Sequence, residues 1–264
     1  MLLTLTSLRW LRRILLIVVI AIAAIAVTTY WVLPVWLSLD TWRQPPKRTR
    51  LTPSDLSDLS VSCASGKQVS YFGYEFELPW SDIDETKTKL YPDMVVLTFR
   101  SGLILMFGVS PPKLWLNGLA SGTKFSAKDV QAAYGTRSDY DFIRMLYDLT
   151  PDKMNLWALS PGVHYRDVYL LTMKSAAVLP WADDGFSRIR HEGYRGFQQG
   201  NPQVSPTIIV DLYSDSGGVH FSVFQKNYTG KRVSQAEINR MTGTLSRTSD
   251  AASSSVAVGA RNCR

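Results

Sequence analysis

The sequence predicts an α+β protein in which one N-terminal transmembrane helix is followed by a domain with a mainly antiparallel sheet. Three observations lead to this fold class. Residues 14–39 contain no charged side chain, later segments show the alternating apolar pattern of strands, and these strand patterns fall into two blocks with helical patterns between them. Strands and helices grouped in this way favour an antiparallel sheet over repeated strand–helix–strand units.

The uncharged segment from Ile14 to Leu39 is long enough to cross a membrane. A helix rises about 1.5 Å per residue, so a hydrocarbon core of about 30 Å needs about 20 apolar residues. Aromatic side chains of the kind that prefer membrane interfaces lie near its ends, namely Trp10, Tyr30, Trp31 and Trp36. We expect Pro34 to end the helix because proline lacks the N–H group that a helix interior needs. The sequence therefore predicts an uncleaved transmembrane anchor over residues 1–39.

A cleaved signal peptide is the alternative for this segment. Ala24-Ile25-Ala26 has the spacing of a cleavage site, and Arg12 and Arg13 precede it. Cleavage there would leave a strongly apolar N-terminus, so we favour the anchor. Charge does not set the orientation, because three arginines precede the segment and four Lys or Arg residues follow it by residue 50.

The net charge of +7 comes from the flanks of the anchor. Residues 1–50 hold seven Lys or Arg and one acidic residue, whereas the rest of the chain holds 22 basic and 21 acidic residues. Basic flanks suit anionic lipid head groups. The globular part lacks the basic excess that nucleic-acid binding needs, so we expect the lipid bilayer as a partner and no nucleic acid.

Two cysteines, Cys63 and Cys263, bracket the globular part and are a candidate disulfide. The ends of a domain often lie close together, but a bridge would need an oxidising compartment, and two unrelated thiols are the alternative. Cys-x-x-Cys, Cys/His and nucleotide-binding motifs are absent from the sequence, so we expect no metal and no cofactor. The cysteines and the signal-like start favour a bacterial inner-membrane protein, single-pass, whose C-terminal domain faces the periplasm.

Residues 40–60 are predicted to form a linker, since they contain three prolines, several basic residues and no apolar periodicity. The α+β domain then spans residues 61–248. Its first strand precedes Pro79 and places on one face Phe72, Tyr74, Phe76 and Leu78. Met94 to Val109 predicts a hairpin that turns at Ser101-Gly102, with both strands central in the sheet because they are apolar on both faces.

Helical patterns come next. We expect helices over residues 126–134, after a cap at Ser138, from Pro151 to Leu159, and from Arg166 to Val178. Strands return at residues 187–191, 195–199, 207–213 and 219–225, and the last two form a second hairpin. Ser234 and Glu237 make a capping box for a final helix, and residues 249–264 are expected to form a flexible tail.

Two segments, FGYEFELPW near the start of the domain and SQAEINRMTGTLS at its end, carry a resemblance together with the order of the elements. Residues 65–248 resemble Mog1/PsbP-like domains, and the chain is similar to uncharacterised bacterial proteins with one membrane anchor and such a domain. The resemblance implies an α/β/α sandwich, in which helices cover both faces of the sheet. It also implies a non-enzymatic adaptor or binding role.

Asp211 and His220 are the candidate catalytic residues. If Leu212 lies opposite Val219 in the second hairpin, as the alignment of the apolar faces requires, Asp211 lies opposite His220. A carboxylate beside an imidazole can orient a general base. The same pair can equally be a cross-strand ion pair, and the sequence signals no nucleophile to go with it, so we favour the ion pair.

The sequence thus favours a non-catalytic binding or scaffolding domain, with an envelope protein as its partner. An envelope hydrolase with an unrecognised site and a small-ligand or lipid-binding domain are the alternatives. An enzyme needs a concave pocket with converging polar side chains, and a ligand-binding domain needs a sizeable apolar cavity. A scaffold needs an exposed apolar or aromatic patch.

Overall fold

The computed structural model describes the chain except for residues 1–2, 59, 63–65, 123–126, 226–231 and 249–264. The chain forms two compact units. Met1–Arg50 and Leu149–Ser175 make up the helical unit, and Leu51–Asp148 and Ala176–Arg264 make up the sheet unit. The candidate disulfide of Cys63 and Cys263 and the expected tail lie outside the described residues.

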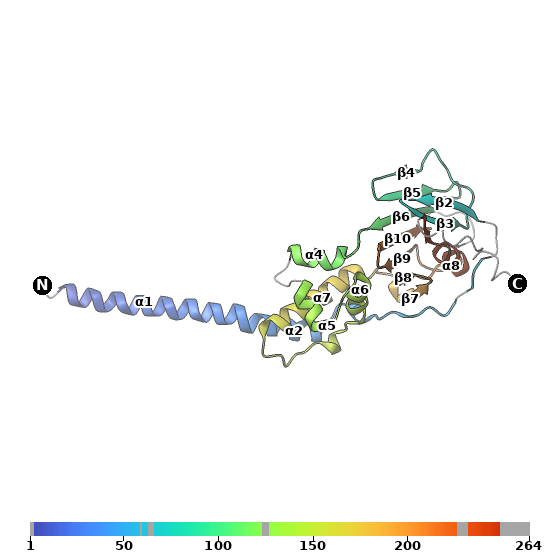
Figure 1. Cartoon of the computed structure of the whole chain (residues 1–264). Helices are drawn as coiled ribbons and strands as arrows, with labels where there is room; N and C mark the ends of the chain where they lie inside the picture. The colour runs from blue at the N-terminus through green and yellow to red at the C-terminus, as the bar shows by residue number, and fades with distance from the viewer. Residues whose placement is uncertain (1–2, 59, 63–65, 123–126, 226–231, 249–264) are drawn as a thin grey trace. The chain divides into compact units, whose positions relative to one another are not determined.

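The helical unit begins with a continuous helical rod, drawn in blue in Figure 1. It consists of α1 (Leu3–Val27), a π-helical turn η1 (Thr28–Val32) and α2 (Leu33–Arg43). The expectation that Pro34 ends the helix is wrong. In the π turn the N–H of Leu33 bonds to the carbonyl of Thr28, five residues back, and this change of hydrogen-bond register lets proline follow at the start of α2.

The rod has the length and composition of a membrane-spanning helix. Arg13–Arg43 contains an 18-residue window with a mean hydropathy of 2.6, and none of that window is buried inside the protein. The prediction of one long apolar N-terminal helix is therefore confirmed.

The rest of the helical unit is α3 (Lys47–Arg50), a 3-10 turn η2 (Pro151–Lys153) and most of α7 (Pro161–Ala177). The helix expected from Pro151 to Leu159 is wrong, because only its first three residues are helical. Helix α7 begins five residues before the expected Arg166, at Pro161, whose fixed φ suits the first helical position.

The sheet unit contains an eight-stranded and a three-stranded sheet. The strand order of the larger sheet is β1-β7-β8-β9-β10-β6-β5-β4, with strands Ser54–Asp55 (β1), Phe186–His191 (β7), Tyr194–Gln199 (β8), Thr207–Ser214 (β9), Gly217–Phe224 (β10), Ile104–Ser110 (β6), Met94–Thr98 (β5) and Lys89–Leu90 (β4). The smaller sheet has the order β11-β3-β2, with strands Ser246–Arg247, Tyr74–Leu78 and Lys67–Tyr71. All pairs are antiparallel except β1 with β7, so the larger sheet is mixed.

The helices of the sheet unit are α4 (Leu114–Gly122), α5 (Ala127–Tyr134), α6 (Asp139–Asp148), the 3-10 turn η3 (Ala182–Asp184) and α8 (Gln235–Gly243). The capping box predicted for the last helix is confirmed, with the Ser234 hydroxyl and the Glu237 carboxylate each bonded to the other residue's backbone N–H. Both predicted hairpins are also present. Together with the long N-terminal helix, these elements confirm an α+β fold.

Two local expectations differ from the structure. Phe72, expected in the first strand, occupies the β2–β3 turn with a positive φ of 53°. Of the two strands expected at the centre of the sheet, β6 is central, but β5 has only the two-residue strand β4 beyond it. The predicted linker, residues 40–60, contains the end of α2, α3 and β1, whose Ser54 and Asp55 pair with β7. The predicted domain bounds, residues 61–248, stay a prediction.

The larger sheet has two faces of different chemistry. The face that we call the core face carries fully buried side chains such as Val210, Leu212 and Phe221, which pack with α8 and the smaller sheet in one apolar core. The opposite face, here called the polar face, carries on successive strands Arg188, Arg190, Arg195, Phe197, Asp211, Tyr213, His220 and Ser222. Helix α6 packs on this polar face, with the rings of Tyr140 and Tyr147 against Phe197.

Candidate functional site

The predicted pair of Asp211 and His220 lies on the polar face, directly opposite each other in β9 and β10. The register that we derived from the apolar alternation is therefore confirmed. His220 Nδ1 lies 2.7 Å from Asp211 Oδ1, and His220 Nε2 lies 2.7 Å from the hydroxyl of Ser222. A carboxylate accepts hydrogen bonds, so Nδ1 carries a proton that it donates to Asp211.

The electrostatics of this Asp-His-Ser chain favour a charged histidine. Burial lowers the pKa of His220, but the hydrogen bond and the negative charge of Asp211 outweigh it, and the net pKa is raised above its ordinary value. Burial and then the same carboxylate also raise the pKa values of the Tyr147 and Tyr213 hydroxyls. Asp211 thus acts as the negative centre of this part of the polar face.

Ser222 is hydrogen-bonded to a histidine, as a catalytic serine is, but its surroundings differ from those of a catalytic serine. The residue is only 3% exposed, so a substrate has little access to its hydroxyl. It lies within β10, between Ile209 of β9 and Met106 of β6, and its backbone belongs to the sheet ladder on both sides. An oxyanion hole needs free backbone N–H groups beside the nucleophile. The arrangement therefore fits a structural polar network better than a triad.

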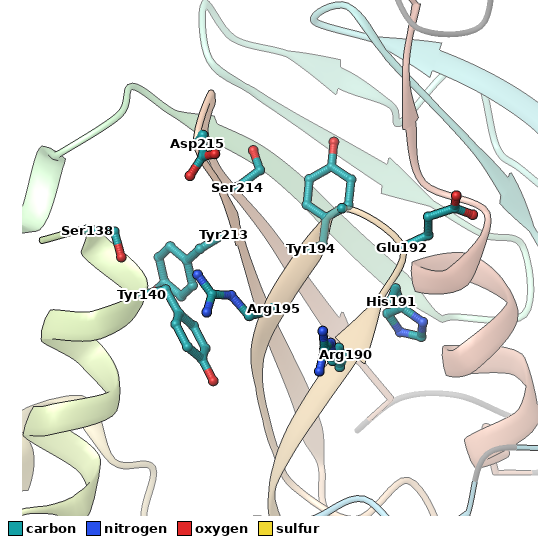
Figure 2. Close-up of a pocket in the computed structure, with 11 residues that line it drawn as sticks. Ser138, Tyr140, Arg190, His191, Glu192, Tyr194, Arg195, Tyr213, Ser214 and Asp215 are labelled. Carbon is teal, nitrogen blue, oxygen red and sulfur yellow. The ribbon is translucent and has the colours of Figure 1, made fainter. Parts of the chain in front are cut away.

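A groove lies beside this network, at the end of the polar face where β7 and β8 are joined. It consists of two adjoining hollows with volumes of about 450 Å³ and 490 Å³, which share Tyr140, Arg190, His191 and Arg195. Figure 2 shows the first hollow, with α6 on one side, α8 on the other, and Arg190 and Arg195 between them. The second hollow is also lined by Arg144 and Arg188. We call these two hollows the arginine groove.

Arg190 and Arg195 face each other across the β7–β8 pair. The turn between these strands is Glu192-Gly193, where a positive φ of 74° at Gly193 allows a two-residue connection. The guanidinium of Arg195 lies 4.5 Å from the centre of the Tyr140 ring, which in turn stacks on Phe197 at 5.6 Å. This stacking holds one cation against an aromatic platform.

Neither of these two arginines has a carboxylate partner among the residues that the structure describes. Other arginines of the sheet unit do have one, such as Arg188 with Asp148 at 2.5 Å and Arg240 with Glu77 at 2.8 Å. Like charges placed directly opposite in a sheet repel each other, so an anion between them would be bound favourably.

No family model, curated protein or solved structure matches this chain. The resemblance to Mog1/PsbP-like domains therefore stays a prediction.

His191 adds no charge to the arginine groove at neutral pH. Burial lowers its pKa, and its Nε2 lies 3.0 Å from the hydroxyl of Thr242 on α8. Among the described residues no group of three or more His, Cys, Asp or Glu side chains could hold a metal ion. The positive charge of the groove thus comes from its arginines, while the carboxylates of Glu192 and Asp215 line the first hollow and that of Asp55 lines the second.

Sequence reasoning found Asp211 and His220 but missed Ser222 and the arginine groove. Ser222 follows His220 by two residues, so strand alternation alone puts both side chains on one face. The facing pair of Arg190 and Arg195 follows from the two-residue turn, since each arginine lies two positions from Glu192-Gly193. Tyr140 had no such signal, because it reaches the groove from a helix some 50 residues earlier in the chain.

Proposed function

We propose that this chain is a single-pass membrane protein whose sheet unit is a non-catalytic binding domain for an anionic segment of an envelope protein. The facing pair of Arg190 and Arg195 carries the proposal. Two exposed guanidinium groups that lack a carboxylate partner among the described residues, on a fixed sheet and over a stacked tyrosine, form a preorganised receptor for carboxylates.

The shape of the groove favours an extended acidic segment over a single small anion. The cations come from α6, β7 and β8 and extend over two adjoining hollows. Arg144 and Arg188 add charge at one end, although each already pairs with an aspartate. A chain with several carboxylates can contact these positions at once, whereas one small anion reaches a single pair.

The test is binding of a fluorescein-labelled hexaglutamate peptide to the full chain in lipid nanodiscs, measured by fluorescence anisotropy at low salt. A charge-assisted hydrogen bond contributes about 1.5–3 kcal/mol, so we expect the Arg190→Gln/Arg195→Gln variant to bind at least about tenfold more weakly. The matched control is Lys67→Gln/Lys89→Gln, which removes the same charge from exposed positions elsewhere on the sheet unit.

Equal loss of binding in the two double variants would mean that net charge rather than the groove attracts the peptide. Competition provides a second arm. If inorganic phosphate displaces the peptide at an equal concentration of charge, the groove binds small anions, and the proposal of an acidic segment fails.

The membrane anchor and the outward-facing domain are part of the same proposal. The long, unburied apolar helix supports the anchor, and the signal-like start supports export of the C-terminal part. Alkaline phosphatase fused after Arg264 is active only in an oxidising compartment, so we expect an active fusion in a bacterial host. Activity restricted to a cytoplasmic reporter at the same position would contradict the placement.

We further propose that the sheet unit is an α/β/α sandwich. Helix α6 on the polar face and α8 on the core face support it. The three-stranded sheet shares the core face with α8, so this layer is not helical throughout. A solved structure of a relative with helices on both faces of the same strand order would test the assignment.

An envelope hydrolase is the second candidate, because Asp211, His220 and Ser222 form a hydrogen-bonded chain. A fluorophosphonate probe labels serine hydroxyls that a histidine activates. We expect no labelling above that of the Ser222→Ala variant, since the serine is buried. Labelling of the wild type that disappears in Ser222→Ala would replace the binding proposal with the hydrolase.

A further inference from the structure

The π-helical turn in the N-terminal rod leaves one backbone carbonyl without its usual partner. The N–H of Leu33 is taken by the carbonyl of Thr28, and the next residue, Pro34, has no N–H to offer to Thr29. The hydroxyl of Tyr165, on the first turn and a half of α7, donates to the Thr29 carbonyl at 3.1 Å. This bond joins α7 to the rod at the point where its hydrogen-bond register changes.

A second contact joins the first turn of α7, and through it the preceding loop, to the rod. The ring of His164 is buried, with Nδ1 3.1 Å from the hydroxyl of Ser38 and Nε2 2.9 Å from the carbonyl of Ala158. A carbonyl can only accept, so Nε2 carries a proton that it donates to Ala158, and the Ser38 hydroxyl also lies 3.4 Å from the backbone carbonyl of His164. The histidine therefore holds Ala158, and the loop around it, next to α2.

This loop presents two apolar side chains to its surroundings. Trp157 is 92% exposed and Leu159 is 87% exposed, which are the highest values among the large hydrophobic side chains that the structure describes. Single exposed apolar residues are common, but these two flank a residue that is fixed by a buried histidine. The buried histidine fixes the backbone between these two residues. Their exposed positions therefore belong to the fold and are not those of an unanchored loop.

The rod also has exposed aromatic and aliphatic side chains. Its members at η1 and the start of α2 are between 41% and 62% exposed and comprise Tyr30, Trp31, Val32, Leu33 and Trp36. Thr29 lies four residues before Leu33 and Ser38 lies five residues after it, so the two contacts with the α7 segment lie on either side of Leu33 along the rod. Trp157 and Leu159 flank Ala158, whose carbonyl is linked through the His164 ring to Ser38 of the rod.

The length of the rod fits a bilayer whose surface lies at these rod side chains. The apolar run from Ile14 to Leu33 has 20 residues, which as a helix spans about 30 Å, the thickness of a hydrocarbon core. Tryptophan and tyrosine prefer the boundary between this core and the head groups. Basic residues follow directly, at Arg43 and in α3, where anionic head groups would lie.

We infer that residues 156–159 form a second membrane contact, in which Trp157 and Leu159 insert into the interfacial layer of the bilayer that the N-terminal helix crosses. This inference rests on the membrane anchor of the proposed function and not on the arginine groove. Two points of contact fix the depth and the rotation of a helix in a bilayer, which a single helix does not fix alone. The loop thereby limits how the anchor can turn about its own axis.

The test measures depth with a fluorescent probe on single cysteines. The full chain, with Cys63 and Cys263 replaced by serine, is labelled at Trp157→Cys, Ile20→Cys or Trp42→Cys and reconstituted in phosphatidylcholine–phosphatidylglycerol vesicles. Ile20 lies in the middle of the apolar run and Trp42 lies nine residues past Leu33, so they mark lipid and water. Iodide in the buffer and a doxyl group near the lipid head group serve as quenchers.

We expect iodide to quench the probe at position 157 at least roughly threefold less than at position 42, because interfacial side chains are shielded from aqueous ions. The doxyl lipid should quench positions 157 and 20 but not 42. If position 157 behaves like position 42 while position 20 is quenched by lipid, the anchor stands and the second contact is wrong. If position 20 is open to iodide as well, the anchor itself fails.

Discussion

The two faces of the eight-stranded sheet come from the same strands but differ in what they contribute. In β9 and β10, Leu212 and Phe221 point to the core face and are fully buried, whereas Asp211 and His220 point to the polar face. The side chains of Asp211 and His220 are 22% and 42% exposed. Stability and candidate function are therefore divided between neighbouring residues of one strand.

This division means that substitutions one residue apart should have different consequences. A change on the core face removes apolar packing with α8 and the smaller sheet. A change on the polar face alters charge and hydrogen bonding and leaves that packing in place. The contrast between the two faces can be measured as the stability of single variants of the full chain in mild detergent.

The largest effect is expected for Phe221→Ala. Phe221 is fully buried and contacts the rings of Phe76 at 5.2 Å and Phe107 at 5.0 Å, so its loss leaves a cavity in the centre of the core. We expect a loss of about 3–5 kcal/mol in the free energy of unfolding. Urea unfolding followed by near-ultraviolet circular dichroism measures it. The control is Ser222→Ala, one residue later on the polar face, with an expected loss of about 1 kcal/mol.

Equal losses in these two variants would mean that the polar network of Ser222 is as important for stability as the core. The division between the two faces would then be wrong.

A smaller loss is expected for Gly196→Ala. Gly196 lies on the core face of β8, and a Cβ atom there would come within 1.8 Å of the carbonyl oxygen of Asp211 on β9. The neighbouring backbone has to move, and such overpacking costs about 1–3 kcal/mol. Gly118→Ala, in α4 with open space around it, should be neutral or slightly stabilising. Tolerance of alanine at position 196 would indicate that β8 and β9 can separate without loss.

The sequence allowed the hairpins and the alternation of the faces to be predicted because both depend on local, two-residue periodicity. Leu212 opposite Val219 follows from this rule, and so does the pair of Asp211 and His220. The helical unit did not follow from it. Pro34 remains inside a helix because a π turn precedes it. The hydroxyl of Tyr165, far along the chain, donates a hydrogen bond to the Thr29 carbonyl, which this turn leaves without a backbone partner.

The arginine groove was missed for a similar reason. The pattern of β7 and β8 contains Arg190 and Arg195, but a charged residue on a strand usually indicates a solvated face. What distinguishes this pair is the Tyr140 ring under Arg195 and the lack of a carboxylate partner among the described residues, both of which depend on how α6 packs. Local periodicity carries no information about such contacts.

A gain in stability is expected for Arg190→Gln. Arg190 lies opposite Arg195, so its removal relieves a like-charge contact of about 0.2–1 kcal/mol. The gain should decrease with added salt, since both side chains are exposed. Arg188→Gln is the matched control on the same strand, and because it breaks the ion pair with Asp148 it should lower stability instead. A loss for both variants would show that Arg190 has a stabilising partner, which would weaken the proposed binding site.

The smallest effect concerns the two histidines of the larger sheet, one on each face. The pKa of His220 is raised by Asp211 against the effect of burial, so the folded state holds this proton more tightly than the unfolded state. Its contribution to stability is then complete below the ordinary histidine pKa of about 6.5 and is lost as the pH rises through the raised value. Because the side chain is 42% exposed, solvent screening should limit the change to about 0.5 kcal/mol.

His191, at the end of β7 on the core face, should show the opposite sign. Burial lowers its pKa, so the unfolded state binds the proton more tightly and stability falls as the pH drops below about 6.5. The measurement is the free energy of unfolding of the wild type, His220→Gln and His191→Gln between about pH 5.5 and 8.5. Relative to each variant, the wild type should lose stability with rising pH for His220 and gain it for His191. Slopes of the same sign would mean that the charge of Asp211 does not reach His220, and that the two faces do not differ in their electrostatics.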